Sequence, residues 1–368
     1  MSGNRLEFIF MVIFSLLLGF DAYAQSYAGA ESCKSCHLEI YQQYSLSGHP
    51  YKIQPINGAA PLFPAKTSSG VPQPPLNKSW QDIRYVVGGF AWKARFLDSQ
   101  GYILTGDNRQ YNLANSLLGQ AAHWVAYGGR ETSRKPYTCG GCHTTGWEPS
   151  GESGPHQDGL PGIYGVWAEP GITCEACHGA SADHVINPTQ VKPTIKENCG
   201  SCHVRGDPTK IDAKAGLVRH HEQYEDLLAS PHKRFVCSTC HDPHRSTHYK
   251  LGGYLGDDKT CKNCHQSIEV KLPAKANLAC STCHMPYLVN SAVSTTVTFA
   301  DGSIPLGDLR SHIQRIRTDN QWEMFTDDGR FVRTDEDGKA YVTLDYACLS
   351  CHVKKDRRWA QLNAKKIH

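Results

Sequence analysis

The cysteines constrain this chain more than any other feature, because all 16 belong to eight copies of one short motif. Each copy reads Cys-x-x-Cys and is followed immediately by histidine. Two thiols at this spacing lie on one turn of chain and can reach the two vinyl groups along one edge of a porphyrin, and the next histidine then lies over the macrocycle, where it can bind iron. In chain order, motifs 1 to 8 are Cys33/Cys36/His37, Cys139/Cys142/His143, Cys174/Cys177/His178, Cys199/Cys202/His203, Cys237/Cys240/His241, Cys261/Cys264/His265, Cys280/Cys283/His284 and Cys348/Cys351/His352.

Three other uses of paired cysteines compete with this interpretation: a disulfide framework, structural zinc sites and redox-active dithiols. None of them requires histidine at the next position. Only 19 of the 368 residues are histidine, so eight such matches do not arise by chance. The sequence therefore predicts eight covalently bound haem c groups, each with its iron.

The remaining histidines supply candidates for the second iron ligand. Methionine offers little, because two of the four methionines lie near the start of the chain, Met285 directly follows a motif histidine, and only Met324 is free. Ligation by two histidines is therefore expected, and it favours low reduction potentials. The candidates are His49, His184, His220, His221, His232, His244, His312 and His368, with His248 and His123 in reserve and His156 expected at the surface.

Local patterns place several of these candidates. His49 follows a predicted helix over 38–47, and His184 lies on a predicted turn shortly after motif 3. The apolar residues between His221 and His232 recur at helical spacing, which predicts a helix with a ligand at each end.

The sequence resembles the multihaem c-type cytochromes related to the tetrahaem cytochrome of ammonia oxidisers and to hydroxylamine oxidoreductase. The resemblance lies in short segments over the mature chain: 27–37, Ser-Gly-His at 47–49, Cys-His-Asp-Pro-His at 240–244, Cys-His-Met-Pro at 283–286 and Gly-Asp-Leu-Arg-Ser-His at 307–312. It implies that the histidines matching His49, His232, His244 and His312 are distal ligands.

The expected fold is that of a multihaem cytochrome c, with mainly short α-helices and loops wrapped around stacked haems and small β-hairpin inserts. A mean hydropathy of −0.46 suits a chain whose interior is filled by haems rather than by aliphatic side chains. The two longest gaps between motifs leave room for β-rich inserts at about 80–130 and 322–345. The first contains alternation from Ile83 with a turn at 98–101, and the second contains Asp328-Gly329 and Asp337-Gly338 turns.

Residues 1–24 are expected to be a signal peptide, with an apolar run from Phe8 to Phe20 and a small-x-small pattern ending at Ala24. The octahaem domain would then span 25–368. The run is too short to cross a bilayer, so we expect the mature protein in the periplasm, at the cell surface or outside the cell.

The formal net charge of +3 does not indicate a nucleic-acid partner, because each haem adds two propionates and makes the loaded protein acidic. The expected partners are redox proteins: a quinol-oxidising membrane donor, and a terminal reductase or extracellular acceptor. A homo-oligomer or filament is a further alternative, since His368 at the end of the sequence is suited to binding a neighbour's haem.

Two function classes remain. The favoured one is electron transfer through mostly bis-histidine, low-potential haems in respiratory or extracellular electron transport, which makes the chain a carrier rather than an enzyme. The alternative is an octahaem oxidoreductase that acts on nitrite, hydroxylamine or a sulfur oxyanion. An enzyme needs one iron with an open position and acid–base groups nearby.

Overall fold

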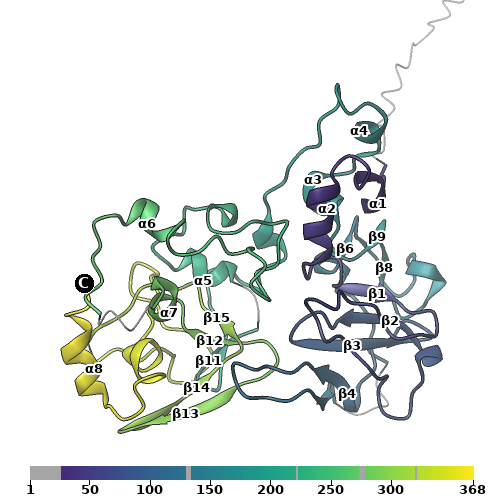
Figure 1. The fold of residues 1–368 in the computed structure, drawn as a ribbon. Coiled ribbons are helices and arrows are strands. Elements are labelled where there is room, and N and C mark those ends of the chain that lie inside the picture. Colours follow the sequence, from purple (N-terminus) through teal and green to yellow (C-terminus); the bar gives the residue numbers. More distant parts are fainter. Residues whose placement is uncertain (1–25, 130–133, 221–222, 273–277, 320) are drawn as a thin grey trace, which may run out of the picture.

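The computed structural model describes residues 26–129, 134–220, 223–272, 278–319 and 321–368. The elements form two groups that follow one another along the chain (Figure 1). The first group contains α1 to α4 and β1 to β9, and the second contains α5 to α8 and β10 to β15. The eight α-helices span Ala30–Cys33, Leu38–Ser45, Cys174–His178, Ala182–Ile186, Tyr224–Leu228, Cys261–Cys264, Cys280–His284 and Arg357–Ala364.

A five-stranded antiparallel sheet dominates the first group, and its strands follow chain order. The predicted turn at 98–101 is present: Asp98 accepts hydrogen bonds from the backbone N–H groups of Gln100 and Tyr102, each at 2.9 Å. The pairing across this turn is limited to an isolated bridge of Leu97 with Ile103, whereas the β2–β3 hairpin turns earlier, between Gly88 and Lys93. Two small pairs, β6 with β9 and β7 with β8, lie beside it. Strands β1 to β9 span Ile53–Pro55, Ile83–Gly88, Lys93–Asp98, Gly106–Asn112, His123–Tyr127, Thr144–Thr145, Glu148–Pro149, Gly165–Val166 and Glu169–Pro170.

The second group is built on a four-stranded sheet in the order β10-β11-β12-β15 and on the hairpin β13–β14. Strand β11 runs parallel to β12, whereas the other neighbours in the sheet are antiparallel. Strands β10 to β15 span Ala213–Lys214, Leu217–Arg219, Tyr287–Asn290, Thr295–Phe299, Gly302–Leu306 and Leu309–Arg310.

Apolar side chains form cores of their own, which the low mean hydropathy did not suggest. The largest cluster lies in the second group and includes the fully buried Leu288, Ile313 and Leu349. Two smaller clusters pack against the five-stranded sheet, where Val86 and Phe96 are fully buried. The gaps between motifs supply these residues, so the polypeptide has a scaffold that does not consist of haem alone.

Several elements differ from the sequence-based expectations. Segment 322–345 forms turns at its two Asp-Gly pairs, but its pairing is limited to isolated bridges such as Phe325 with Val332. The helix expected between His221 and His232 is reduced to α5, with Ser230 and Pro231 after its end. His184 lies on α4 rather than on a turn.

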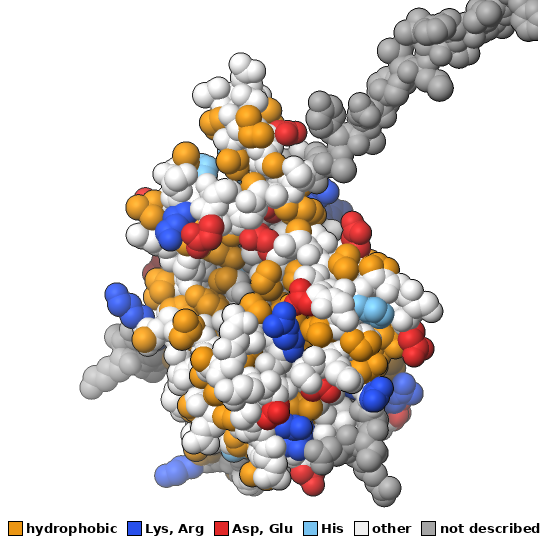
Figure 2. Space-filling model, turned by 90° about the vertical axis from the view of Figure 1, so that its right-hand side faces the viewer, with side chains coloured by type: hydrophobic (Ala, Val, Ile, Leu, Met, Phe, Trp, Pro, Cys, Tyr) orange, Lys and Arg blue, Asp and Glu red, His pale blue; other side chains and the backbone are white. Residues whose placement is uncertain are grey.

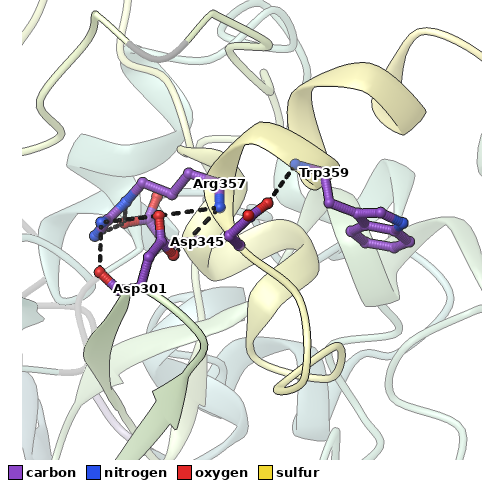
Figure 3. Close-up of polar contacts among 5 residues, drawn as sticks. Asp301, Asp345, Arg357 and Trp359 are labelled. Atoms are coloured by element: carbon purple, nitrogen blue, oxygen red, sulfur yellow. Dashed lines mark hydrogen bonds and ion pairs between the residues drawn. The ribbon is translucent and has the colours of Figure 1, made fainter.

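Arg357 ties three elements of the second group together (Figure 3). Its guanidinium bonds Asp345 of the π-helical turn Asp345–Leu349 at 3.1 Å, and it also contacts Asp301 in the β13–β14 turn. Asp356 caps the first turn of α8 by accepting a hydrogen bond from the N–H of Trp359 at 2.7 Å. These contacts hold α8 beside motif 8, because the π-helical turn includes the first residues of that motif.

Charged side chains of both signs are scattered over the face that carries the first group of elements (Figure 2). Lysine and arginine stand singly there, among acidic and hydrophobic side chains. That face therefore presents no field of one sign. None of the helices in the described ranges is long and apolar enough to cross a membrane.

Replacing Asp356 by alanine should lower the free energy of unfolding by about 1 kcal/mol, because the first turn of α8 loses its side-chain cap. Thermal unfolding followed by circular dichroism measures the change. Glu336→Ala, which removes an exposed carboxylate from a surface turn, is the control and should leave the midpoint unchanged. Equal midpoints for the two variants would show that the cap does not hold the helix.

Candidate haem-binding sites

Each motif folds as a single helical turn. In motifs 1, 4, 5, 6 and 8 the histidine N–H donates to the carbonyl of the first cysteine at 2.8–3.0 Å, and motifs 3 and 7 lie within α3 and α7. In motif 2 the donor is His143 and the acceptor is Gly140, at 2.9 Å. Both sulfurs and the imidazole therefore project from one turn, which is the arrangement that covalent haem attachment requires.

Motif 2 shows how packing holds such a turn. Trp147 lies so close to Gly140 that a Cβ atom there would come within 2.1 Å of the indole ring. Only glycine fits between the two cysteines at that position. None of the 16 cysteines is in a disulfide, so every pair is available for thioether bonds.

Many of the predicted haem-binding residues are exposed in the polypeptide, and the expected wrapping of helices and loops around the haems stays a prediction. The buried members of the three apolar clusters are other residues, so the structure does not show such wrapping at these positions. The exposed cysteines are Cys36, Cys139, Cys142, Cys177, Cys264 and Cys351, and the exposed histidines are His37, His265, His352 and His368. A thiol must be reachable by a vinyl group to form a thioether, so this exposure is compatible with attachment. The roles of these residues stay predictions.

Five motif histidines face a second histidine. The ring centres are 6.4 Å apart for His184 and motif 1, 6.1 Å for His244 and motif 3, 6.1 Å for His312 and motif 5, 6.0 Å for His232 and motif 6, and 5.9 Å for His368 and motif 7. An iron between two imidazoles needs this spacing: two metal–nitrogen bonds of about 2 Å each, plus about 1 Å from each nitrogen to its ring centre. The residues present therefore fit haem iron.

His49 lies near motif 4, since the charge of His203 is one of the causes that lower its pKa, after burial and Lys52. Burial is the main cause that lowers the pKa of His49, His143 and His312 to about 3. Each imidazole is therefore neutral at physiological pH, with a lone pair free for a metal. The roles of all these histidines as ligands stay predictions.

The other candidates have different surroundings. His220 lies near motif 2, where its charge contributes to the lowered pKa of His143, and its own backbone has a φ of 71°. His221 lies outside the described residues. His248 packs edge-on against Trp92 at 4.2 Å between ring centres. His123 sits in β5, and both ring nitrogens of His156 bond backbone carbonyls, at 2.6 and 3.0 Å.

Sulfurs of different motifs lie next to one another. The contact with motif 2 lowers the pKa of Cys202 to about 6, and the contact with Cys237 lowers the pKa of Cys199 to about 7. Burial and then Cys33 raise the pKa of Cys174 to about 12. A sulfur in a thioether bond does not titrate. These pKa shifts show which sulfurs lie near one another.

Neighbouring cysteines relate all eight motifs to one another. Cys33 of motif 1 contacts Cys174 of motif 3, and motif 4 contacts motif 2 through Cys142 and motif 5 through Cys237. Motifs 3 and 4, 5 and 6, 6 and 7, and 7 and 8 lie close enough for the charges of their cysteines to interact. Between motifs 6 and 7, Cys261, Cys280 and the Asp257 carboxylate lie within 4.8 Å of one another. The result is a continuous line with one branch, at motif 4.

Cationic side chains surround motif 2, a feature that sequence reasoning missed. Burial lowers the pKa of Lys52 and of Arg95, and both charges add to the main effect of burial in lowering the pKa of His143. Arg95 donates to Gln110 at 2.9 Å and stacks on Tyr127. The sequence offered one signal for a role of Lys52, namely its position three residues after His49, a predicted ligand.

Motif 8 has no facing histidine among the described residues. Its His352 packs instead against Trp359 of α8, with ring centres 4.7 Å apart. Met324, the remaining methionine candidate, is buried in the large apolar cluster beside Leu349 and Tyr346. It is therefore placed as a core residue.

Two family models match parts of the chain. Residues 230–270, which hold motifs 5 and 6, match the doubled CXXCH motif, and residues 112–179, which hold motifs 2 and 3, match cytochrome c554 and c-prime. These matches agree with the resemblance found in the sequence.

Two curated proteins are similar over longer stretches of the chain. The dissimilatory sulfite reductase MccA of Wolinella succinogenes is 22% identical over 89% of this chain and 61% of its own length. The polyhaem cytochrome OmcC of Geobacter sulfurreducens is 26% identical over 35% of this chain and 18% of its own. The chain thus spans about three-fifths or less of these curated relatives.

Two solved structures share the fold. The octahaem sulfite reductase MccA aligns with a TM-score of 0.57 and 18% identity over 94% of this chain and 68% of that one. The outer cell wall cytochrome OcwA aligns with a TM-score of 0.57 and 19% identity over 92% of this chain and 86% of that one.

Replacing His232 by alanine should convert one haem to the high-spin state, because motif 6 loses the imidazole that faces it. Electron paramagnetic resonance of the oxidised protein measures the change. His156→Ala is the matched control, since its imidazole is occupied by backbone carbonyls. A low-spin spectrum unchanged by the loss of His232 would remove it from the ligand set.

Proposed function

We propose that this chain is a multihaem c-type cytochrome that transfers electrons through eight covalently bound haems in respiratory or extracellular electron transport. The observation that carries the proposal is the continuous line of neighbouring motifs. Porphyrins attached at neighbouring motifs would have their edges close together, so an electron on any haem would have a short step to the next.

The facing histidines support the same role. Motifs 1, 3, 4, 5, 6 and 7 each have a candidate second imidazole, and a six-coordinate iron exchanges electrons without binding a substrate. Histidine on both faces also lowers the reduction potential relative to histidine with methionine. The residues therefore suit a low-potential chain of carriers.

The cellular setting is proposed on a similar basis. OcwA, whose fold this chain shares, is an outer cell wall cytochrome. We place this chain in the periplasm or outside the cell, exported by residues 1–24. Its donor would be a quinol-oxidising membrane protein, and its acceptor a reductase or an extracellular oxidant.

Replacing His312 by methionine should interrupt the line at motif 5, because a methionine ligand raises the potential of that haem and traps an electron there. The reduced protein is mixed with ferric oxide particles, which are too large to reach every haem directly, and re-oxidation is followed by absorbance. The native protein should re-oxidise in one phase. The variant should show two phases, with the haems beyond motif 5 delayed.

His156→Met serves as the control, because it adds a methionine without touching a predicted ligand. Single-phase re-oxidation of the His312 variant would contradict transfer along the line. The same samples give the haem count, since eight attached groups raise the mass of the chain by eight haems.

A second function is favoured by the surroundings of motif 2. A haem there would act as a catalyst if its second axial position opened to an oxyanion, and the half-buried cations Lys52 and Arg95 would hold sulfite or nitrite beside it. Fixed positive charges in a site with little water stabilise negative charge far better than they do in bulk water. The Lys52 ammonium also offers protons.

Replacing Lys52 by methionine should slow sulfite- or nitrite-dependent oxidation of the reduced protein by about 100-fold, the usual cost of losing one charge-stabilising donor. Lys66→Met, an exposed lysine, is the control. Stopped-flow spectroscopy measures the rate. If the native protein is not oxidised by either anion, the enzyme function is excluded and electron transfer alone remains.

A further inference from the structure

One residue lies between the ligands of two neighbouring haem sites. The side-chain oxygen of Gln314 is 2.7 Å from Nδ1 of His232, which faces motif 6. The backbone oxygen of the same residue is 2.8 Å from Nδ1 of His284, the histidine of motif 7. When Nε2 of each ring binds iron, Nδ1 carries the proton, and both oxygens of Gln314 are hydrogen-bond acceptors.

The backbone of Gln314 is strained. Its φ is 60°, and the N–H of Arg315 donates to the carbonyl of Ile313 at 2.7 Å, a bond across a single residue. Together these describe a γ-turn of the positive-φ type, which is rare because it is strained. Such strain persists only where the surroundings enforce it, and it concentrates at functional sites.

The neighbours on both sides enforce this turn. Ile313 is fully buried in the large apolar cluster. Arg315 accepts a backbone hydrogen bond from Val342 at 2.7 Å, and its guanidinium donates to the carbonyl of Ala229 at 3.3 Å. The backbone of Gln314 is thereby held where its carbonyl meets one imidazole and its side chain reaches the other.

The same segment reaches a third haem site. His312, two residues earlier, faces motif 5 and is held by Asp226, which accepts hydrogen bonds from the His312 backbone N–H at 2.9 Å and from the Ser311 hydroxyl at 2.8 Å. The segment 312–314 therefore supplies a candidate ligand at motif 5, contacts the candidate ligand at motif 6 and contacts the histidine of motif 7.

We propose that Gln314 is a positioning residue that sets the ligand orientation and lowers the reduction potential of the haems at motifs 6 and 7. The proposal rests on the proposed electron-transfer function and deepens it, because it identifies which residue tunes two adjacent steps. An acceptor on the outer nitrogen makes an imidazole a stronger base, and a stronger base stabilises ferric iron over ferrous iron.

One variant distinguishes the two hydrogen bonds that Gln314 makes with His232 and His284. Gln314→Leu removes the side-chain acceptor from His232 and leaves the backbone carbonyl on His284. The reduction potential of the haem at motif 6 should then rise. A tenfold change in the preference for ferric iron, at the lower end of the usual effect of outer ligands, corresponds to about 59 mV for a one-electron couple.

Spectroscopy identifies which haem moves. The imidazole planes at motif 6 are 84° apart and those at motif 7 are 33° apart, so the two oxidised irons should give different low-spin resonance signals. Redox titration of the full chain, followed by electron paramagnetic resonance, should show the signal of the nearly perpendicular pair altered and its midpoint raised. The signal of the motif 7 pair should remain.

Three further variants make the test decisive. Gln314→Glu keeps an acceptor and should restore the orientation with a potential at or below the native one. Gln314→Gly relieves the backbone strain but lacks the acceptor, so it should resemble the leucine variant in potential. Gln266→Leu, next to motif 6 but bonded only to a backbone carbonyl, should change nothing.

Unchanged midpoints and signals in the leucine variant would overturn the role of Gln314, while leaving the haem count and electron transfer intact. A native potential in the glycine variant would also overturn it, because the side-chain acceptor would then be dispensable. Failure of His312→Met to interrupt re-oxidation would instead count against the electron-transfer function itself.

Discussion

The architecture depends on the sheets and apolar clusters that hold the eight motifs next to one another. Each motif is a single helical turn, which by itself is too short to be stable in water. The turns are arranged so that motif 1 lies beside motif 3, and so on to motif 8. The sheets and apolar clusters hold these turns at the required separation. The apolar cores thus serve to position a line of sites.

Both groups of elements position their motifs in the same way. The five-stranded sheet and its aromatic residues carry motif 2, with Trp147 pressed against Gly140. The second group carries motifs 5 to 8 on short helices around the cluster that contains Ile313 and Leu349. In each case a buried apolar residue stands a few positions from a predicted iron ligand, so that the imidazole is positioned by the core next to it.

The sequence predicted the parts that have a strict residue code. The motif spacing located all eight turns, the helical pattern after motif 1 predicted α2, and the alternation from Ile83 predicted strands followed by a turn at 98–101. We did not predict β13 and β14 from the sequence, although Asp301-Gly302 stands at their turn. Nor did the sequence reveal Lys52 or Gln314, because their importance comes from three-dimensional neighbours far away in the chain. Gln314 meets His232 across 82 residues, and no local pattern encodes that distance.

The branch at motif 4 gives the line of sites an uneven sensitivity to damage. An end site such as motif 8 can be lost and the remaining seven still form one connected set. Motif 4, in contrast, is the junction of three arms, since its cysteines lie beside motifs 2, 3 and 5. Losing it would leave motif 2 isolated, motifs 1 and 3 as a pair, and motifs 5 to 8 as a separate row. The eight sites are therefore connected through a single junction.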